Sequence, residues 1–82
     1  MAIYLGIHNM GVAMAEDKMQ GSWEAYKSAC AKLGMSAKHC HMSPEQGKAF
    51  CLTEADSADL ITMAHDEAGV PVDEVIEVID FN

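Results

Sequence analysis

An α+β fold with the element order β-α-β-β-α-β is predicted by three observations on this 82-residue chain. Residues 2–8 alternate between apolar and other side chains, as a strand does. Residues 14–33 carry an apolar stripe at helical spacing. Residues 39–52 place a Ser-Pro-Glu-Gln-Gly turn between two short runs, which is typical of a β-hairpin. With a second helix and a last strand, this order predicts the ferredoxin-like fold, a four-stranded antiparallel sheet with both helices on one face.

The first half of the chain supplies a strand over residues 2–8 and a helix over residues 14–33. Glu16 and Asp17 lie in the first turn of the helix, where acidic side chains suit the helix dipole. Gly34 is a natural C-terminal stop. The apolar stripe of this helix steps by four and three residues through Met19, Trp23, Tyr26, Cys30 and Leu33.

The second half supplies strands over residues 35–42 and 48–54, a helix, and a β-branched strand over residues 74–79. Gly69 ends the helix and Pro71 follows two residues later. The helix is capped by Asp56 or Ser57, and its buried stripe consists of Leu60, Ile61, Ala64 and Ala68.

The alternation of the strands predicts which side chains face the helices. We expect the three most apolar rows to face them: Ile3-Leu5-Ile7, Phe50-Leu52 and Ile76-Val78. The opposite, uncovered face would then carry Tyr4, His8, His39, His41, Cys51, Thr53, Val75, Glu77 and Ile79. A mixed apolar and polar face on so short a chain predicts a homodimer.

Composition narrows the possible partners. Residues 1–82 are expected to form one domain, because this length suits a single core. The net charge is −8 and the chain has no arginine, which argues against nucleic-acid binding. No apolar run is long enough to span a membrane, so no membrane partner is expected. Three cysteines fit no disulfide framework, which predicts free thiols in a reducing cytoplasm.

The strongest candidate site is a metal site at one end of the sheet. In the predicted topology His8 and His41 lie at the same edge and on the same face, with Cys51 on the strand between them. Imidazole and thiolate suit nickel, copper, zinc or cobalt better than calcium or magnesium. His39 lies farther from the edge, and His65 on the second helix is a further ligand candidate.

A structural interpretation of the same residues stays open. His39 and His41 can be half-exposed strand residues, Cys51 a small buried hydrophobe, and His65 a partly buried histidine without a ligand role. The seven methionines lack a Met-x-x-Met spacing and are interpreted as gap-filling residues of the core. No nucleophile elbow or phosphate-binding loop is present, and no catalytic residue is assigned.

Several stretches resemble a bacterial family of small nickel-binding or nickel-responsive proteins, often described only as a domain of unknown function. The similar stretches are Tyr4-Leu5-Gly6-Ile7-His8, residues 47–55 (Gly-Lys-Ala-Phe-Cys-Leu-Thr-Glu-Ala) and residues 68–78. The resemblance implies a ferredoxin-like fold, usually dimeric, with histidines and neighbouring groups as metal ligands. The residues of this chain that match the family pattern position by position are His8 and Cys51. The chain departs from the family pattern at His39, His41, Asp56 and the spacing of His65.

The sequence thus predicts a protein that binds, sequesters or senses nickel or another divalent transition metal. A small dimeric α/β-barrel enzyme is one alternative, with His8, His41 or Cys51 acting in a cavity on the open sheet face. A non-catalytic oligomerisation module is the other.

Overall fold

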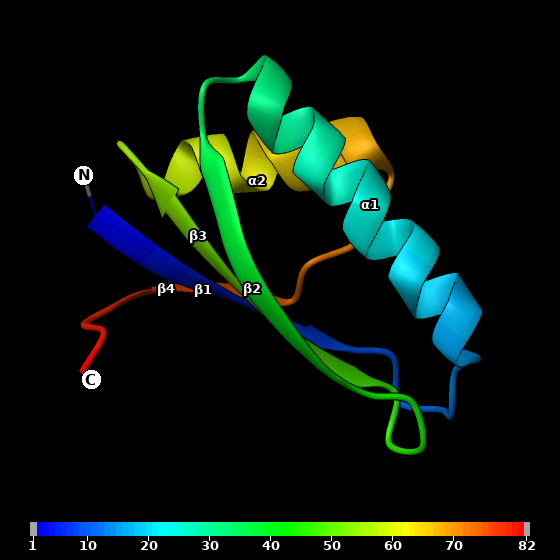
Figure 1. Ribbon diagram of the computed structural model, residues 1–82. Coiled ribbons are helices and arrows are strands. Elements are labelled where there is room, and N and C mark those ends of the chain that lie inside the picture. Colours follow the sequence, from blue (N-terminus) through cyan, green and yellow to red (C-terminus); the bar gives the residue numbers. More distant parts are fainter. Residues whose placement is uncertain (1, 82) are drawn as a thin grey trace.

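Two helices lie together on one side of a strongly twisted sheet, and the sheet's other side has no helix over it (Figure 1). This computed structural model describes residues 2–81. The strands are β1 (Ala2–Asn9), β2 (Ser36–Ser43), β3 (Lys48–Ala55) and β4 (Glu74–Val78), and the helices are α1 (Glu16–Lys32) and α2 (Ala58–Ala68). The order along the chain is β-α-β-β-α-β, as predicted.

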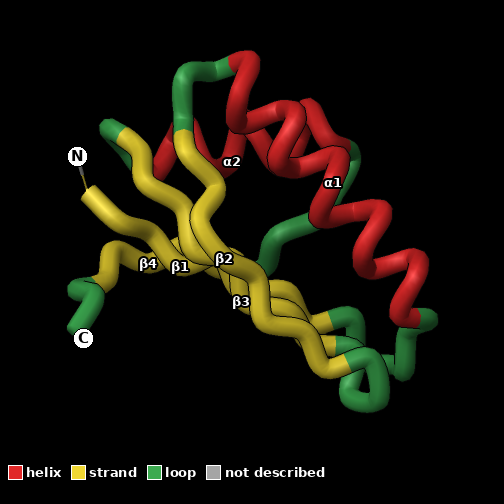
Figure 2. The backbone as a smooth tube through the Cα atoms, viewed as in Figure 1, coloured by secondary structure: helices red, strands yellow, loops and turns green. Residues whose placement is uncertain are grey.

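The four strands form one antiparallel sheet in the order β2-β3-β1-β4. The two central strands, β1 and β3, come from the two halves of the chain, and β2 and β4 are the edges. Figure 2 shows the helices as one layer and the strands as another. This is the ferredoxin-like α+β fold, and the predicted fold class is confirmed.

The helices begin and end close to the predicted residues. Glu16 and Asp17 lie in the first turn of α1, and α2 ends at Ala68 with Gly69 as its C-cap, in a left-handed conformation with a φ of 70°. In the part of the chain that the structure describes, neither helix is long and apolar enough to cross a membrane.

The predicted assignment of the two sheet faces is wrong for β1, β3 and β4, where Val75 and Glu77 also fall in the helix-facing rows of Gly6 and Tyr4. Tyr4 and His8 are buried beneath the helices, and so are Cys51 and Thr53. Conversely, the apolar rows that were expected under the helices lie on the uncovered face and are half-buried or exposed: Ile3, Leu5, Ile7, Phe50, Leu52, Ile76 and Val78. His39 and His41 do lie on that face, opposite Leu52 and Phe50.

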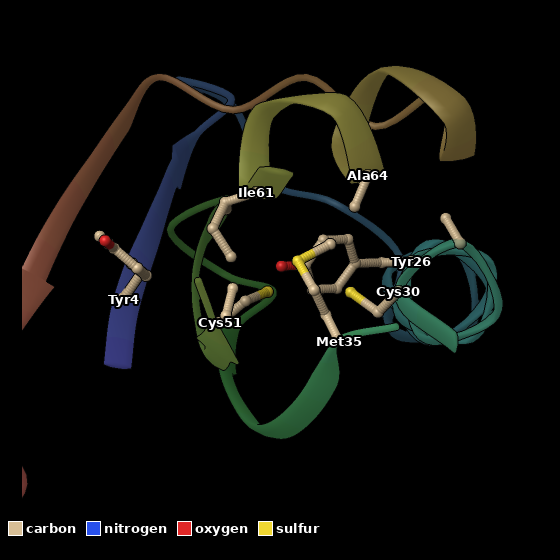
Figure 3. Close-up of a cluster of buried hydrophobic side chains, with 9 residues drawn as sticks. Tyr4, Tyr26, Cys30, Met35, Cys51, Ile61 and Ala64 are labelled. Atoms are coloured by element: carbon tan, nitrogen blue, oxygen red, sulfur yellow. The ribbon is translucent and has the colours of Figure 1, made fainter. Parts of the chain in front are cut away.

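The two helices contribute large buried side chains to the core on this side of the sheet. Tyr26 of α1 and Ile61 of α2 are among the largest fully buried side chains. Figure 3 shows Tyr26 reaching from α1 across the core toward the strand that carries Cys51, while Ile61 and Ala64 come down from α2. The Tyr26 hydroxyl lies 2.6 Å from Oγ1 of the buried Thr53, so its polar end is hydrogen-bonded.

Backbone hydrogen bonds tie the loops at one end of the sheet together. The Met10 N–H donates to the Gly47 carbonyl and the Met14 N–H to the Pro44 carbonyl, both at 2.8 Å. These bonds hold the segment between β1 and α1 against the β2–β3 turn. On the other side of β1, the Asp73 N–H donates to the Ile7 carbonyl at 2.9 Å. The loop before β4 is therefore held beside the end of β1.

Candidate functional site

A cavity of about 120 Å³ lies between α1, α2 and the helix-facing side of the sheet. Among residues 2–81, two histidines, two cysteines and four methionines line it, and no carboxylate does. These residues are His8, His65, Cys40, Cys51, Met10, Met14, Met19 and Met42. On the sheet, the small side chain of Ala49 lines the cavity between its two strand partners, His8 and Met42.

His8 lies near the end of β1 with only 3% of its surface exposed. Its Nδ1 is 2.6 Å from the carbonyl oxygen of Pro71, in the loop that the bond between Asp73 and Ile7 holds in place. A carbonyl oxygen can only accept a hydrogen bond, so Nδ1 carries the proton in neutral His8. The other ring nitrogen, Nε2, then presents a lone pair.

His65 reaches the same cavity from α2 and is 1% exposed. Its Nδ1 donates to the carbonyl oxygen of Ile61 at 2.8 Å, so its Nε2 also presents a lone pair. The ring stacks on Tyr26 with centroids 4.1 Å apart and lies over Gly6 of β1. Burial lowers the pKa of His65 below its usual value of 6.5, so this imidazole is neutral at pH 7.

The two imidazoles lie beside each other, with ring centroids 4.9 Å apart and planes tilted by 46°. Within residues 2–81, the Nε2 atoms of His8 and His65 are both buried and have no hydrogen-bond partner. A buried polar atom without a partner costs free energy, and such atoms in native proteins often mark a ligand site. Two imidazoles whose Nε2 atoms are buried side by side without a hydrogen-bond partner are a donor pair for a transition metal.

The two cysteines of the cavity face each other across β2 and β3. Cys40 pairs with Cys51 in the sheet register, and their Sγ atoms are 3.3 Å apart. Cys51 is buried next to Gly6, which is its partner on β1. The hydrogen bond from Cys51 lowers the pKa of Cys40, while the same interaction together with burial raises the pKa of Cys51. Of the two thiols, Cys40 is therefore the one whose pKa favours ionisation.

The structure brings together His8, Cys51 and His65 from the predicted ligand set and leaves out His39 and His41. The expectation that His8 and His41 share a sheet face is wrong, because His8 faces the helices and His41 faces away. Within residues 2–81, no group of three or more histidine, cysteine or acidic side chains is arranged to hold a metal ion. A site in this cavity therefore starts from two nitrogens and needs further donors.

Sequence reasoning missed Cys40 and the four methionines as cavity residues. The sequence of the hairpin could have indicated Cys40. Ser43 pairs with Lys48 next to the turn, and three residues farther along each strand Cys40 pairs with Cys51. The methionines gave no signal, because they are far apart along the chain and only the fold gathers them.

The family model described as "Nickel responsive protein SCO4226-like" matches residues 4–78. Among solved structures, the crystal structure of SCO4226 from Streptomyces coelicolor A3(2) has a TM-score of 0.89 and is 22% identical in sequence. The match covers 99% of this chain and 100% of that chain, and at this identity it shows a shared fold. A search of curated proteins found no match. Because the family model covers nearly the whole chain, this protein belongs to the SCO4226-like family of nickel responsive proteins.

Proposed function

We propose that this protein binds nickel or a related transition metal ion in the cavity, through Nε2 of His8 and Nε2 of His65. The observation that carries the proposal is that both atoms are buried and unpartnered in one cavity. The family description, nickel responsive, agrees with this chemistry. The protein would then act by sequestering or sensing the ion.

The way each ring is held supports a ligand role. Histidines that bind metals commonly donate the other ring N–H to a backbone carbonyl or a carboxylate, which fixes the tautomer and the ring orientation. Pro71 and Ile61 supply such carbonyls to His8 and His65. Both rings are therefore oriented before an ion arrives.

The spacing of the rings also fits a shared ion. Metal–nitrogen bonds of about 2.0–2.1 Å place two imidazole centroids roughly 4.5–5 Å apart when the nitrogens are adjacent ligands. The observed separation is 4.9 Å. Cys51, the thioethers that line the cavity, or water would complete the coordination. Nitrogen and sulfur donors suit nickel, copper, cobalt and zinc, whereas calcium and magnesium require oxygen ligands.

Equilibrium dialysis against Ni²⁺, with metal analysis of the retained protein, tests this proposal. We compare two double variants, each of which removes two imidazoles. The cavity variant combines His8→Gln and His65→Gln, and the open-face variant combines His39→Gln and His41→Gln. The first pair lies in the cavity and the second lies exposed on the open face. The cavity pair should lose stoichiometric Ni²⁺ binding, and the open-face pair should bind as the parent does.

The opposite result would overturn the proposal: binding lost with the open-face pair and kept with the cavity pair. Circular dichroism of both variants checks that they fold. If the cavity double variant does not fold, His65→Gln alone replaces it. Visible absorption of the Ni²⁺ or Co²⁺ complex gives a second readout, since loss of one imidazole ligand changes the metal spectrum even where some binding remains.

We also propose that the uncovered sheet face joins two copies of the chain as a homodimer. The predicted dimer face included Tyr4 and Val75, but both lie on the helix side. The face left uncovered instead has an apolar centre, with Leu5, Leu52 and Ile76 side by side across three strands. Such a patch favours a protein partner. Sedimentation should show a dimer at ~100 µM, well above a µM-range dissociation constant, and Leu5→Glu should convert it to a monomer.

A further inference from the structure

Cys40 and Cys51 are positioned for a covalent bond as well as a hydrogen bond. They are directly opposite each other in the antiparallel pair of β2 and β3. Residues opposite each other in such a pair have Cα atoms about 4.5 or 5.5 Å apart, and both values lie within the range found for disulfides. Their Sγ atoms are 3.3 Å apart, so side-chain rotation with a small backbone shift would bring them to bonding distance.

The surroundings allow that movement. Strand β2 is an edge of the sheet, paired only with β3, and its register is irregular between Ala37 and His39. An edge strand has no second neighbour to hold it in place, so β2 can approach β3 at modest cost. The other described thiol, Cys30, is on α1 and fully buried.

The two thiols differ in access. Cys40 is half-buried and also lines a second, more open hollow of about 420 Å³, between the start of α1 and the β2–β3 turn. Cys51 is only 6% exposed and lies behind it. A small reagent from solvent therefore reaches Cys40 first, and Cys51 is within contact distance of the product.

We propose that Cys40 and Cys51 form a redox-active dithiol that a hydroperoxide oxidises to a cross-strand disulfide. The thiolate of Cys40 attacks one peroxide oxygen, the O–O bond breaks, and Cys40 becomes a sulfenic acid while hydroxide leaves and takes up a proton. The Cys51 thiol then attacks the Cys40 sulfur, forming the S–S bond and releasing the sulfenic oxygen as water. In total, two thiols and one hydrogen peroxide give one disulfide and two water molecules.

Formation of this disulfide does not require metal binding by the two histidines, although Cys51 is also one of the possible further donors of the proposed metal site in the same cavity. Its consequence for that cavity is nevertheless direct, because a sulfur bonded to another sulfur is no longer a thiolate donor. Oxidation would remove both thiols from the lining and leave the two imidazoles and the thioethers.

Thiol counting and peptide mapping of the folded protein after hydrogen peroxide treatment test the proposal. Metal-free protein is oxidised, blocked with iodoacetamide, digested and analysed by mass spectrometry. The three free thiols of the reduced protein should fall to one, and the remaining thiol should be Cys30. A peptide pair linking Cys40 and Cys51 should appear, and dithiothreitol should restore all three thiols.

Three variants sharpen the result. Cys30→Ser is the matched control, and it should form the disulfide as the parent does. Cys51→Ser removes the second thiol, so the sulfenic acid at Cys40 should persist and be trapped by dimedone. Cys40→Ser should leave Cys51 unoxidised on the time scale of the parent reaction. Cys51→Ala replaces Cys51→Ser if the serine variant does not fold.

The proposal is overturned if the parent keeps three thiols, if the linked peptides include Cys30, or if the disulfide forms only between two chains. It is also overturned if Cys40→Ser is oxidised at Cys51 as fast as the parent. Non-reducing electrophoresis separates intrachain from interchain bonds. None of these readouts depends on metal binding, so the dithiol and the proposed metal site succeed or fail separately.

Discussion

The imidazole of His65 lies over the backbone of Gly6, and a Cβ atom at Gly6 would come within 3.3 Å of His65 Cε1. The ring has little freedom to retreat, because it stacks on Tyr26 and its Nδ1 is bonded to the Ile61 carbonyl. The missing side chain of Gly6 is therefore what lets α2 place an imidazole next to Cys51, the partner of Gly6 in the sheet.

Gly6→Ala should consequently destabilise the protein and weaken Ni²⁺ binding. Overpacking of this kind typically costs about 1–3 kcal/mol. Gly21→Ala is the matched control, since Gly21 lies within α1 and an added Cβ meets nothing within 4 Å. The control should raise stability by up to about 1 kcal/mol through helix propensity. Urea unfolding of the two variants measures both effects, and equal stability for both would refute the close contact.

The buried imidazole of His65 should make the protein less stable in mild acid. Because burial lowers its pKa in the folded state, the unfolded chain binds this proton more tightly. The stability that His65 contributes is complete above about pH 6.5 and is lost as the pH falls from there toward the folded pKa. One proton gives a slope of at most about 1.4 kcal/mol per pH unit.

Urea unfolding at several pH values, with a chelator present, measures that slope. His65→Gln should flatten the pH dependence of the unfolding free energy between pH 7 and 5, because the variant lacks the imidazole that takes up a proton on unfolding. His39→Gln is the control, because it removes an exposed imidazole from the open face. A pH profile that His65→Gln leaves unchanged would contradict the prediction.

The hydrogen bond between Tyr26 and Thr53 should show strong coupling in a double-mutant cycle. Thr53 is fully buried and its Oγ1 lies 2.6 Å from the Tyr26 hydroxyl. Tyr26→Phe leaves the Thr53 hydroxyl unpaired, which should cost about 1–3 kcal/mol of unfolding free energy. Adding Thr53→Val should recover much of that loss, because both polar groups are then gone. Additive losses in the double variant would refute the coupling.

The turn between β2 and β3 should tolerate no side chain at Gly47. A Cβ there would lie 1.8 Å from the Val12 carbonyl oxygen, and the residue has a φ of +65°. Gly11→Ala is the matched control, since Gly11 also has a positive φ of +76° but open space around it. The control should lower the unfolding free energy by about 1–2 kcal/mol through backbone strain, and Gly47→Ala should lower it clearly more. Thermal unfolding measures the loss of stability in both variants. The difference between the two losses reports the steric clash, because both variants share the strain of a positive φ.

Local sequence patterns were enough for the elements and their order. The alternation at 2–8, the stripe at 14–33 and the Ser-Pro-Glu-Gln-Gly turn depend on backbone geometry within a few residues, so their prediction is confirmed. The right-handed crossover rule then leaves one plausible topology for this order. The stretches that resemble the nickel-responsive family also lie within the match to residues 4–78.

The tertiary structure alone decided which face of the sheet is covered. Alternation divides β1 into the rows Ile3-Leu5-Ile7 and Tyr4-Gly6-His8, but it does not say which row meets the helices. Hydrophobicity favoured the first row, and the helices instead cover the second, where Gly6 makes room for His65. That choice separated His8 from His41 and joined His8 to His65. Both His8 and His65 are ligand candidates in the sequence, but their pairing was not predictable, because they are far apart in the chain and meet only where α2 packs on β1.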